Sequence, residues 1–276
     1  MRINNNIMAM NTHRQLSINN NSGANSMEKL SSGFRINRAG DDAAGLSISE
    51  KMRGQIRGLQ QASRNAQDGI SMIQTAEGSL QEAHAILQRM RELSVQAAND
   101  TNVAADRTSI KDELDELKLE LTRINNNTQF NTENVLDGTA GTAGKVNLLV
   151  GANKGEEMEL DLTIKGIKLD DVISSLVVDV SDSDKAQDFV ELVNTAITDV
   201  SAGRSKLGAW QNRLEHTIKN LDNAAENLQA AESRIRDVDM AKEMMDFTKA
   251  NILQQASTAM LAQANMAPQS VLQLLG

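Results

Sequence analysis

LGAWQNRLEHTIKNLDNAAENLQAAESRIRDV, residues 207–238, is the stretch that decides the fold. Two rows of residues run through it at a spacing of seven: Leu207, Leu214, Leu221, Leu228 and Ile235 form one, and Trp210, Thr217, Ala224, Ala231 and Val238 the other. Residues three and four apart lie on the same face of a helix. A repeat of this length therefore predicts helices packed lengthwise against one another.

The N-terminal half carries a matching pattern. Met52, Leu59, Ala66, Ile73, Leu80 and Leu87 are again seven apart, beside a second row rich in small residues. An ordinary globular helical core, the alternative, seldom needs uninterrupted helices of about 40 residues, or about 60 Å. We therefore predict a mostly α fold, an elongated antiparallel helical bundle or coiled coil. Its packing seam is predicted to contain Leu59, Ile73, Leu80, Leu87, Leu207, Leu214, Leu221, Leu228 and Ile235.

The middle of the chain changes its period. A polar break at Asn99–Asn102 precedes a further helix, which is marked by Ile110, Leu114, Leu117, Leu121 and Ile124 and ends at Asn125–Asn127. Apolar residues then alternate with period two in Lys145–Val150 and from Met158 to Ile164, which predicts a small β-hairpin. The segment Asp171–Val180 is expected to be a short strand or a loop.

Both chain ends have helically spaced apolar residues, but they differ in composition. The first 40 residues are rich in Asn and Ser, which are poor helix formers, so this segment should be marginal in isolation. The C-terminal pattern is expected to be interrupted by Pro268. Because an amphipathic helix must bury its apolar stripe or stay largely unfolded, the terminal residues Ile3, Ile7, Leu272 and Leu275 are expected to pack against other helices.

Composition excludes several classes of function. The chain has no Cys, so it has no disulfide, no thiolate nucleophile and no cysteine metal site. A net charge of −9 and 2% aromatic residues argue against nucleic-acid binding. His13, His84 and His216 lack the spacing of metal ligands, and no catalytic constellation or cofactor motif occurs, so we predict that the protein is not an enzyme.

The sequence also bears on targeting. Residues 1–25 are crowded with Asn and lack the basic start and apolar run of a signal peptide. No stretch approaches about 18 apolar residues, so no membrane insertion is expected.

Several segments at both ends resemble the bacterial flagellins. At the N-terminus these are residues 1–16 (MRINNNIMAMNTHRQL), 30–57 (LSSGFRINRAGDDAAGLSISEKMRGQIR) and 66–76. At the C-terminus they are residues 207–215 (LGAWQNRLE), 230–239 (AAESRIRDVD) and 262–275 (AQANMAPQSVLQLL). The large outer domains of many flagellins are absent, so the chain resembles a minimal form of the family.

The resemblance implies a subunit that polymerises with other copies of itself into the extracellular flagellar filament for motility. It implies residues 1–42 and 236–276 as the two parts of an inner filament-core helical domain, and 43–235 as an outer-core rod with a small β region at about 138–180. It also implies secretion in the unfolded state without a cleaved signal peptide. The implied partners are an export chaperone, a cap protein and hook-junction proteins, and the termini order on polymerisation.

The resemblance further implies a binding site for the host Toll-like receptor 5. Gln88, Arg89, Leu93 and Glu113 match the receptor-contacting pattern of the family. The alternative is that Arg89 and Glu113 are only partners between adjacent helices and between filament subunits.

Two other functions stay open at this point. A hook-filament junction protein of the flagellin-like family would share the terminal helices but would not polymerise indefinitely. A monomeric coiled-coil adaptor would keep its oligomeric state when residues 271–276 are removed.

Overall fold

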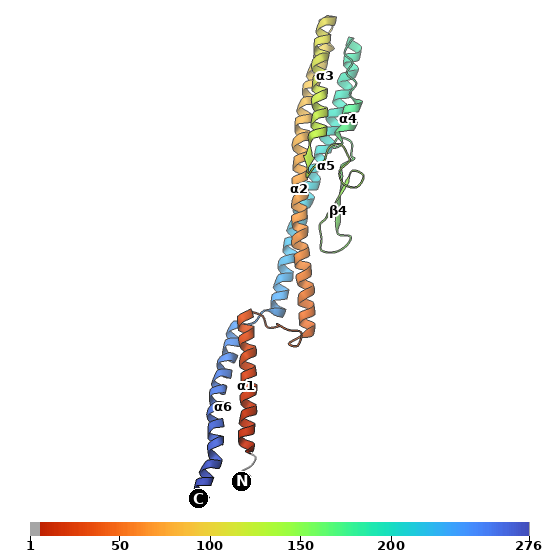
Figure 1. Ribbon diagram of the computed structural model, residues 1–276. Helices are drawn as coiled ribbons and strands as arrows, with labels where there is room; N and C mark the ends of the chain where they lie inside the picture. Colours follow the sequence, from red (N-terminus) through yellow and green to blue (C-terminus); the bar gives the residue numbers. More distant parts are fainter. Residues whose placement is uncertain (1–5, 276) are drawn as a thin grey trace. The chain divides into compact units, whose positions relative to one another are not determined.

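A computed structural model of the chain describes residues 6–275, with side chains as far as Met266. Its elements are α1 (Ile7–Ser32), α2 (Ala43–Ala97), α3 (Ala104–Asn127), β1 (Gln129–Phe130), β2 (Glu133–Asn134), β3 (Lys145–Leu149), β4 (Glu157–Asp161), α4 (Leu169–Ser175), α5 (Ser183–Arg236) and α6 (Met240–Leu275) (Figure 1). The predicted class, a helical bundle with a small central hairpin, is confirmed.

The elements form two compact units. Unit 1 contains residues 1–54 and 227–276, and unit 2 contains residues 55–226. Each unit takes part of α2 and part of α5. The division at residues 42 and 236 that the resemblance implied stays a prediction.

In unit 1, polar caps fix the ends of α1 and α6. The Asn6 side chain accepts a hydrogen bond from the Ala9 amide at the start of α1, and Gly33 ends this helix in the left-handed conformation, with a φ of 75°. Asp239 accepts from the amides of Ala241 and Lys242 at the start of α6. The helix then continues to Leu275, so the expected interruption at Pro268 is wrong. A proline inside a helix lacks the amide donor, and its ring crowds the carbonyl four residues earlier. Here that carbonyl, of Ala264, has a replacement donor in the Asn6 side chain.

Helices α1 and α6 pair in antiparallel fashion. The Asn6 side-chain amide donates to the Ala264 carbonyl (2.7 Å) near one end of the pair, and the Val238 amide donates to the Gly33 carbonyl (3.0 Å) at the other. Among the side chains of these two helices that are described, those up to Met266, the buried ones are small: Ser26, Ala250 and Ala264. Small side chains let the two backbones approach closely, but they bury little apolar surface.

In unit 2, α2 and α5 also run antiparallel. Ser63 of α2 donates to Asp222 of α5 (3.2 Å), while Glu77 lies 3.7 Å from Arg204, earlier in α5. The predicted seam residues Ile73, Leu80, Leu87, Leu207 and Leu214 are at most 1% exposed, and Leu221 is 9% exposed. Leu59 is half-buried in unit 2, as are Leu228 and Ile235 in unit 1.

Helix α3 begins after the polar break at Asn99–Asn102 and ends at Asn127, as predicted. The prediction of a strand or loop for Asp171–Val180 is partly wrong, because residues 169–175 form the helix α4. The physical reason is the spacing of Leu169, Val172 and Ile173, which lie on one face of a helical turn and are all buried. The loop prediction holds for residues 176–180.

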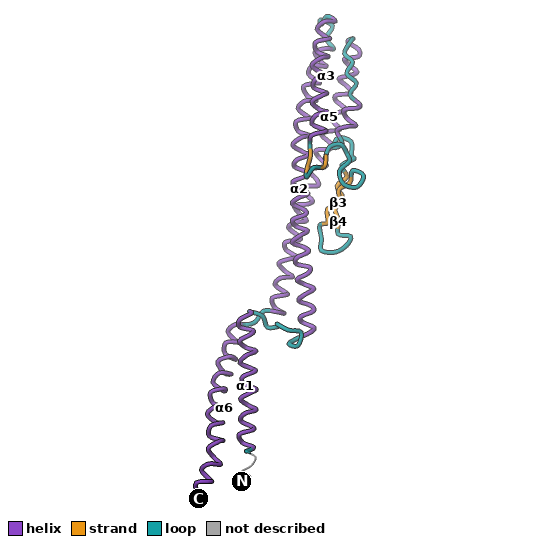
Figure 2. Tube along the Cα trace, viewed as in Figure 1, coloured by secondary structure: helices purple, strands orange, loops and turns teal. Residues whose placement is uncertain are grey.

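Two hairpins connect α3 to α4 (Figure 2). Strands β3 and β4 form the predicted hairpin, in which Val146 pairs with Leu160 and Leu148 with Met158. This hairpin packs on α2: the Asn65 side-chain amide donates to the Leu149 carbonyl (3.0 Å), and a Cβ on Gly69 would lie 2.3 Å from Leu148 Cδ1. The tiny hairpin of β1 and β2 was not predicted, because two-residue strands leave no periodic pattern.

The first testable prediction concerns burial in the seam. Leu221→Asp should lower the free energy of unfolding by roughly 3 to 5 kcal/mol, because it places an unpaired charge on a buried helix face. Leu119→Asp, at an α3 leucine that is 62% exposed, is the matched control and should change stability by about 0.5 kcal/mol or less. Urea unfolding followed by circular dichroism measures both. Near-equal midpoints would contradict the seam.

The second prediction concerns backbone strain in the β1–β2 turn. Asn131 and Thr132 have φ values of 50° and 69°, and a β-branched residue is disfavoured in this region. Thr132→Gly should therefore raise the free energy of unfolding by about 0.5 to 1 kcal/mol. The control is Thr101→Gly, at a loop residue that does not have a positive φ. This substitution should leave the free energy of unfolding unchanged or lower it. Thermal denaturation of the two variants distinguishes these outcomes.

Candidate functional site

The apolar surface of unit 1 is the first candidate site. Thirteen of the nineteen large apolar side chains that are exposed in the described part of the chain belong to unit 1. They are Ile7, Met8, Met10, Ile18, Met27, Ile48, Met240, Met244, Met245, Ile252, Leu253, Met260 and Met266. Exposed apolar side chains that gather in one part of a protein mark interaction sites more often than single scattered ones do.

Part of this surface is a shallow hollow on α6. Met245, Ile252 and Leu253 line it together with Thr248 and Lys249, and its volume is about 420 Å³. These residues are spaced by three, four and seven positions, so they share one face of the helix. The face is suited to receiving an apolar side chain from another helix.

The predicted terminal residues are placed as follows. Ile7 opens α1 and is 63% exposed. Ile3 lies outside the described residues. Leu272 and Leu275 belong to the last turns of α6, and their side chains are also outside the described part of the structure.

A charged pair joins α2 to α3 in unit 2. Arg89 donates through Nε and Nη2 to Glu113 Oε1, at 3.1 and 2.9 Å, and through Nη1 to Glu92 Oε2, at 3.2 Å. These hydrogen bonds, first the one to Glu113, raise the pKa of Arg89 above its usual value. Since all three side chains are about half exposed or more, the pair contributes little to stability and leaves polar atoms facing solvent.

The other two residues of the predicted receptor site differ from each other. Gln88 is exposed, and its side-chain nitrogen lies 2.9 Å from Nε2 of His84. Leu93 is 2% exposed and belongs to the core of unit 2. Gln88, Arg89 and Glu113 are therefore all accessible, and Arg89 and Glu113 are joined across α2 and α3, whereas Leu93 is buried in the core.

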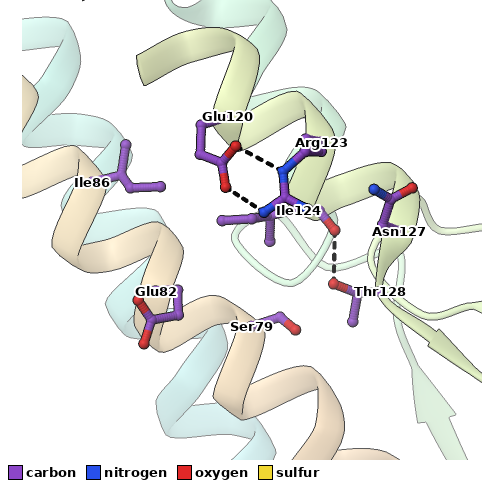
Figure 3. A pocket seen from close by; sticks show the side chains of 8 residues that line it. All are labelled: Ser79, Glu82, Ile86, Glu120, Arg123, Ile124, Asn127 and Thr128. Atoms are coloured by element: carbon purple, nitrogen blue, oxygen red, sulfur yellow. Dashed lines mark hydrogen bonds and ion pairs between the residues drawn. The ribbon is translucent and has the colours of Figure 1, made fainter. Parts of the chain in front are cut away.

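A hollow of about 360 Å³ lies farther along the same two helices (Figure 3). Ser79, Glu82 and Ile86 line it from α2, and Glu120, Arg123, Ile124, Asn127 and Thr128 from α3 and its end. Arg123 forms a fork with both carboxylate oxygens of Glu120, which lowers the pKa of Glu120. None of the buried, unpartnered polar atoms of the described residues lines the hollow, so we assign no ligand to it.

Sequence reasoning missed a buried polar network in unit 1. Glu232, which is 7% exposed, accepts a hydrogen bond from the Ser49 hydroxyl and forms an ion pair with Nε of Arg53, both at 2.9 Å. The guanidinium groups of Arg53 and Arg236 lie 5.2 and 4.8 Å from the centre of the Phe34 ring. By spacing, Glu232 would pair with Arg236 four residues later. The long-range partner Arg53 leaves no such signal.

The described residues contain neither a metal site nor a membrane-spanning helix. Within residues 6–275, no group of three or more His, Cys, Asp or Glu side chains could hold a metal ion. No helix in this range has the combination of length and apolar composition that crossing a membrane requires.

Known proteins match the chain over most of its length. Residues 3–141 match the bacterial flagellin N-terminal helical region, and residues 190–275 match the bacterial flagellin C-terminal helical region. The chain is 63% identical to a flagellin of Halalkalibacterium halodurans over 276 residues and 55% identical to a flagellin of Bacillus subtilis over 303 residues. Each alignment covers 100% of both proteins.

A solved structure shares the fold at much lower identity. It is a putative flagellar hook-associated protein from Vibrio parahaemolyticus, with a TM-score of 0.58 and 13% identity over 71% of this chain and 100% of that one. At this identity the likeness concerns the fold alone. The two matched regions and the full-length relatives show that the chain belongs to the bacterial flagellin family.

Proposed function

We infer that the chain is a structural subunit of the bacterial flagellar filament, which lies outside the cell and serves motility. Its similarity to flagellins from end to end supports this function over that of a hook-filament junction protein. The single structural observation that carries the inference is the large apolar surface that α1 and α6 leave exposed in unit 1. We propose that other copies of the same chain cover this surface, because the relatives that match the chain from end to end are flagellins.

The physical mechanism is repeated association through two different surfaces of the subunit. A contact of this kind is heterologous, and it builds an open helix when its rotation does not close a ring. Since these side chains are already partly covered, each Ile, Leu or Met that another copy covers contributes roughly 1 to 2 kcal/mol. We propose that the terminal residues Ile3, Ile7, Leu272 and Leu275 contribute to this interface. The work of the protein is mechanical, and we propose no enzymatic activity.

We propose that the same surface determines how the subunit is handled before assembly. An export chaperone would cover the apolar face of α6 that includes Met245, Ile252 and Leu253, and so prevent premature association. Export would occur in the unfolded state, without a cleaved signal peptide, and assembly would follow beneath a cap protein at the end of the growing filament, which begins at the hook-junction proteins. The paucity of large buried residues on α1 and α6 supports a terminal pair that orders only on assembly.

The third prediction tests polymerisation. The concentrated, purified full chain should form long filaments in electron micrographs when seeded with filament fragments. Ile252→Ser should raise the concentration needed for growth about tenfold, because a buried apolar contact is lost. The matched control is Leu119→Ser, since Ile252 and Leu119 are both 62% exposed but only Ile252 belongs to unit 1.

Other outcomes of the same assay separate the alternatives. Removal of residues 271–276 should abolish filaments while the melting of unit 2 stays unchanged. A junction protein would give short or ring-like assemblies at any concentration. A wild-type chain that stays monomeric with seeds would contradict the proposed function.

We further propose that the surface formed by Gln88, Arg89 and Glu113 binds Toll-like receptor 5, with Leu93 holding α2 in place. The support is the accessible, directional set of donors and acceptors that these residues present on two adjacent helices. In the filament, neighbouring subunits would contact the same groups and so cover them. Receptor binding is therefore proposed for the free subunit.

The fourth prediction tests this site. Arg89→Ala combined with Glu113→Ala should reduce signalling by the free subunit in a reporter cell that carries the receptor about tenfold or more, because two charged anchors are lost. Arg123→Ala combined with Glu120→Ala removes an equally exposed Arg–Glu pair from α3 and is the control. Equal signalling by a monomeric, folded double variant of Arg89 and Glu113 would reject the assignment.

A further inference from the structure

Methionines are distributed unequally between the two units. In unit 1, eight methionine side chains are 49–68% exposed: Met8, Met10, Met27, Met240, Met244, Met245, Met260 and Met266. In unit 2, Met72, Met90 and Met158 are at most 7% exposed. Accessible thioether groups are therefore concentrated in the unit that is proposed to form the filament interface.

Apart from the half-buried Met52 of α2, the rest of the described chain offers little competition for an oxidant. The sequence contains no Cys and no Tyr, and its one Trp, Trp210, is 7% exposed. A two-electron oxidant that reaches the folded subunit therefore meets the exposed thioethers first, since susceptibility follows accessibility.

The exposed methionines form two groups, one toward each end of the α1–α6 pair. The hydrogen bond from Asn6 to Ala264 places Met8 and Met10 within about one turn of the level of Met260 and Met266. The bond between Val238 and Gly33 at the opposite end places Met27 within about two turns of Met240, Met244 and Met245. Oxidation at either group would change the same apolar surface.

We propose that these eight methionines are an oxidation site through which a hydroperoxide blocks polymerisation of the free subunit. In each step a lone pair of the thioether sulfur attacks the terminal peroxide oxygen. The S–O bond forms as the O–O bond breaks, and the leaving oxygen takes a proton and departs as water, or as an alcohol from an alkyl hydroperoxide. The sulfur loses two electrons and becomes a sulfoxide, while the peroxide is reduced.

The consequence for assembly rests on the proposed filament function. A sulfoxide is polar and accepts hydrogen bonds strongly, so burying it against an apolar neighbour without a partner is unfavourable. Methionines already covered in a filament would be protected by their neighbours. Sulfoxides can be reduced enzymatically, so the block is reversible.

The fifth prediction tests this site with the full chain and hydrogen peroxide. Peptide mass spectrometry of the unassembled protein, with unit 2 folded, should find sulfoxide at the eight positions before Met72, Met90 and Met158 react. Seeded growth, followed by sedimentation, should slow by about tenfold or more after oxidation. Treatment with methionine sulfoxide reductases should restore it.

Two sets of variants separate the surface methionines from the buried ones. Replacing all eight exposed methionines by Leu conserves apolar character and helix propensity, and should make growth insensitive to peroxide. Replacing Met72, Met90 and Met158 by Leu is the matched control, and should leave the wild-type sensitivity. If the variant with all eight substitutions does not form filaments even without peroxide, each group of four methionines is replaced by Leu separately. Filament growth of each of these two variants should retain part of its sensitivity to peroxide.

Defined outcomes would overturn the proposal. One is unchanged growth of wild type in which the eight positions are fully converted to sulfoxide. Another is oxidation of the three buried methionines at the same rate as the eight exposed methionines. Failure of untreated wild type to grow would instead contradict the filament function, while the order of oxidation would still be read by mass spectrometry.

Discussion

The structure depends on how much apolar surface each pair of helices can bury. In unit 2, α2 and α5 enclose large residues such as Leu80, Leu87, Leu207 and Leu214, each no more than 1% exposed. Burying one leucine contributes roughly 1.5 to 3 kcal/mol, so a row of them can offset the entropy of ordering long helices. The hairpins and α4 add to the same core through residues such as Leu160 and Leu169.

The α1–α6 pair of unit 1 is built on the opposite balance. Ser26, Ala250 and Ala264 lie between α1 and α6, and these side chains bury little area. Many large residues of the pair, including Ile252 and Met266, are exposed instead, while Leu16, Leu30, Phe247 and Leu261 are half-buried. A subunit that buried them internally would have nothing to offer a neighbour. In the proposed filament, this incomplete core would make polymerisation favourable, and before assembly it would leave the thioethers open to oxidants.

Polar contacts specify which residues of two helices lie opposite each other, which apolar packing alone does not. In unit 1, Glu232 of α5 accepts a hydrogen bond from Ser49 and forms an ion pair with Arg53, two residues of α2 that lie 183 and 179 positions earlier in the chain. Breaking one partner of such a buried network leaves a charge unpaired. In unit 2, the exposed pair of Arg89 and Glu113 contributes little to stability, so these side chains are free to bind a partner.

The sequence by itself determined the helical class, the seam rows and the β3–β4 hairpin, because heptad and period-two patterns are local and repeat over many residues. It also determined the family, through the segments at both ends. The tertiary structure alone decided that residues 169–175 are helical, that Glu232 is buried against Arg53, and that Leu93 lies beneath its polar neighbours. These features depend on partners far away in the chain, and short segments such as β1 and β2 contain too few residues for a period to emerge. Which methionines are exposed was likewise decided by packing, since every methionine is equally apolar in a sequence.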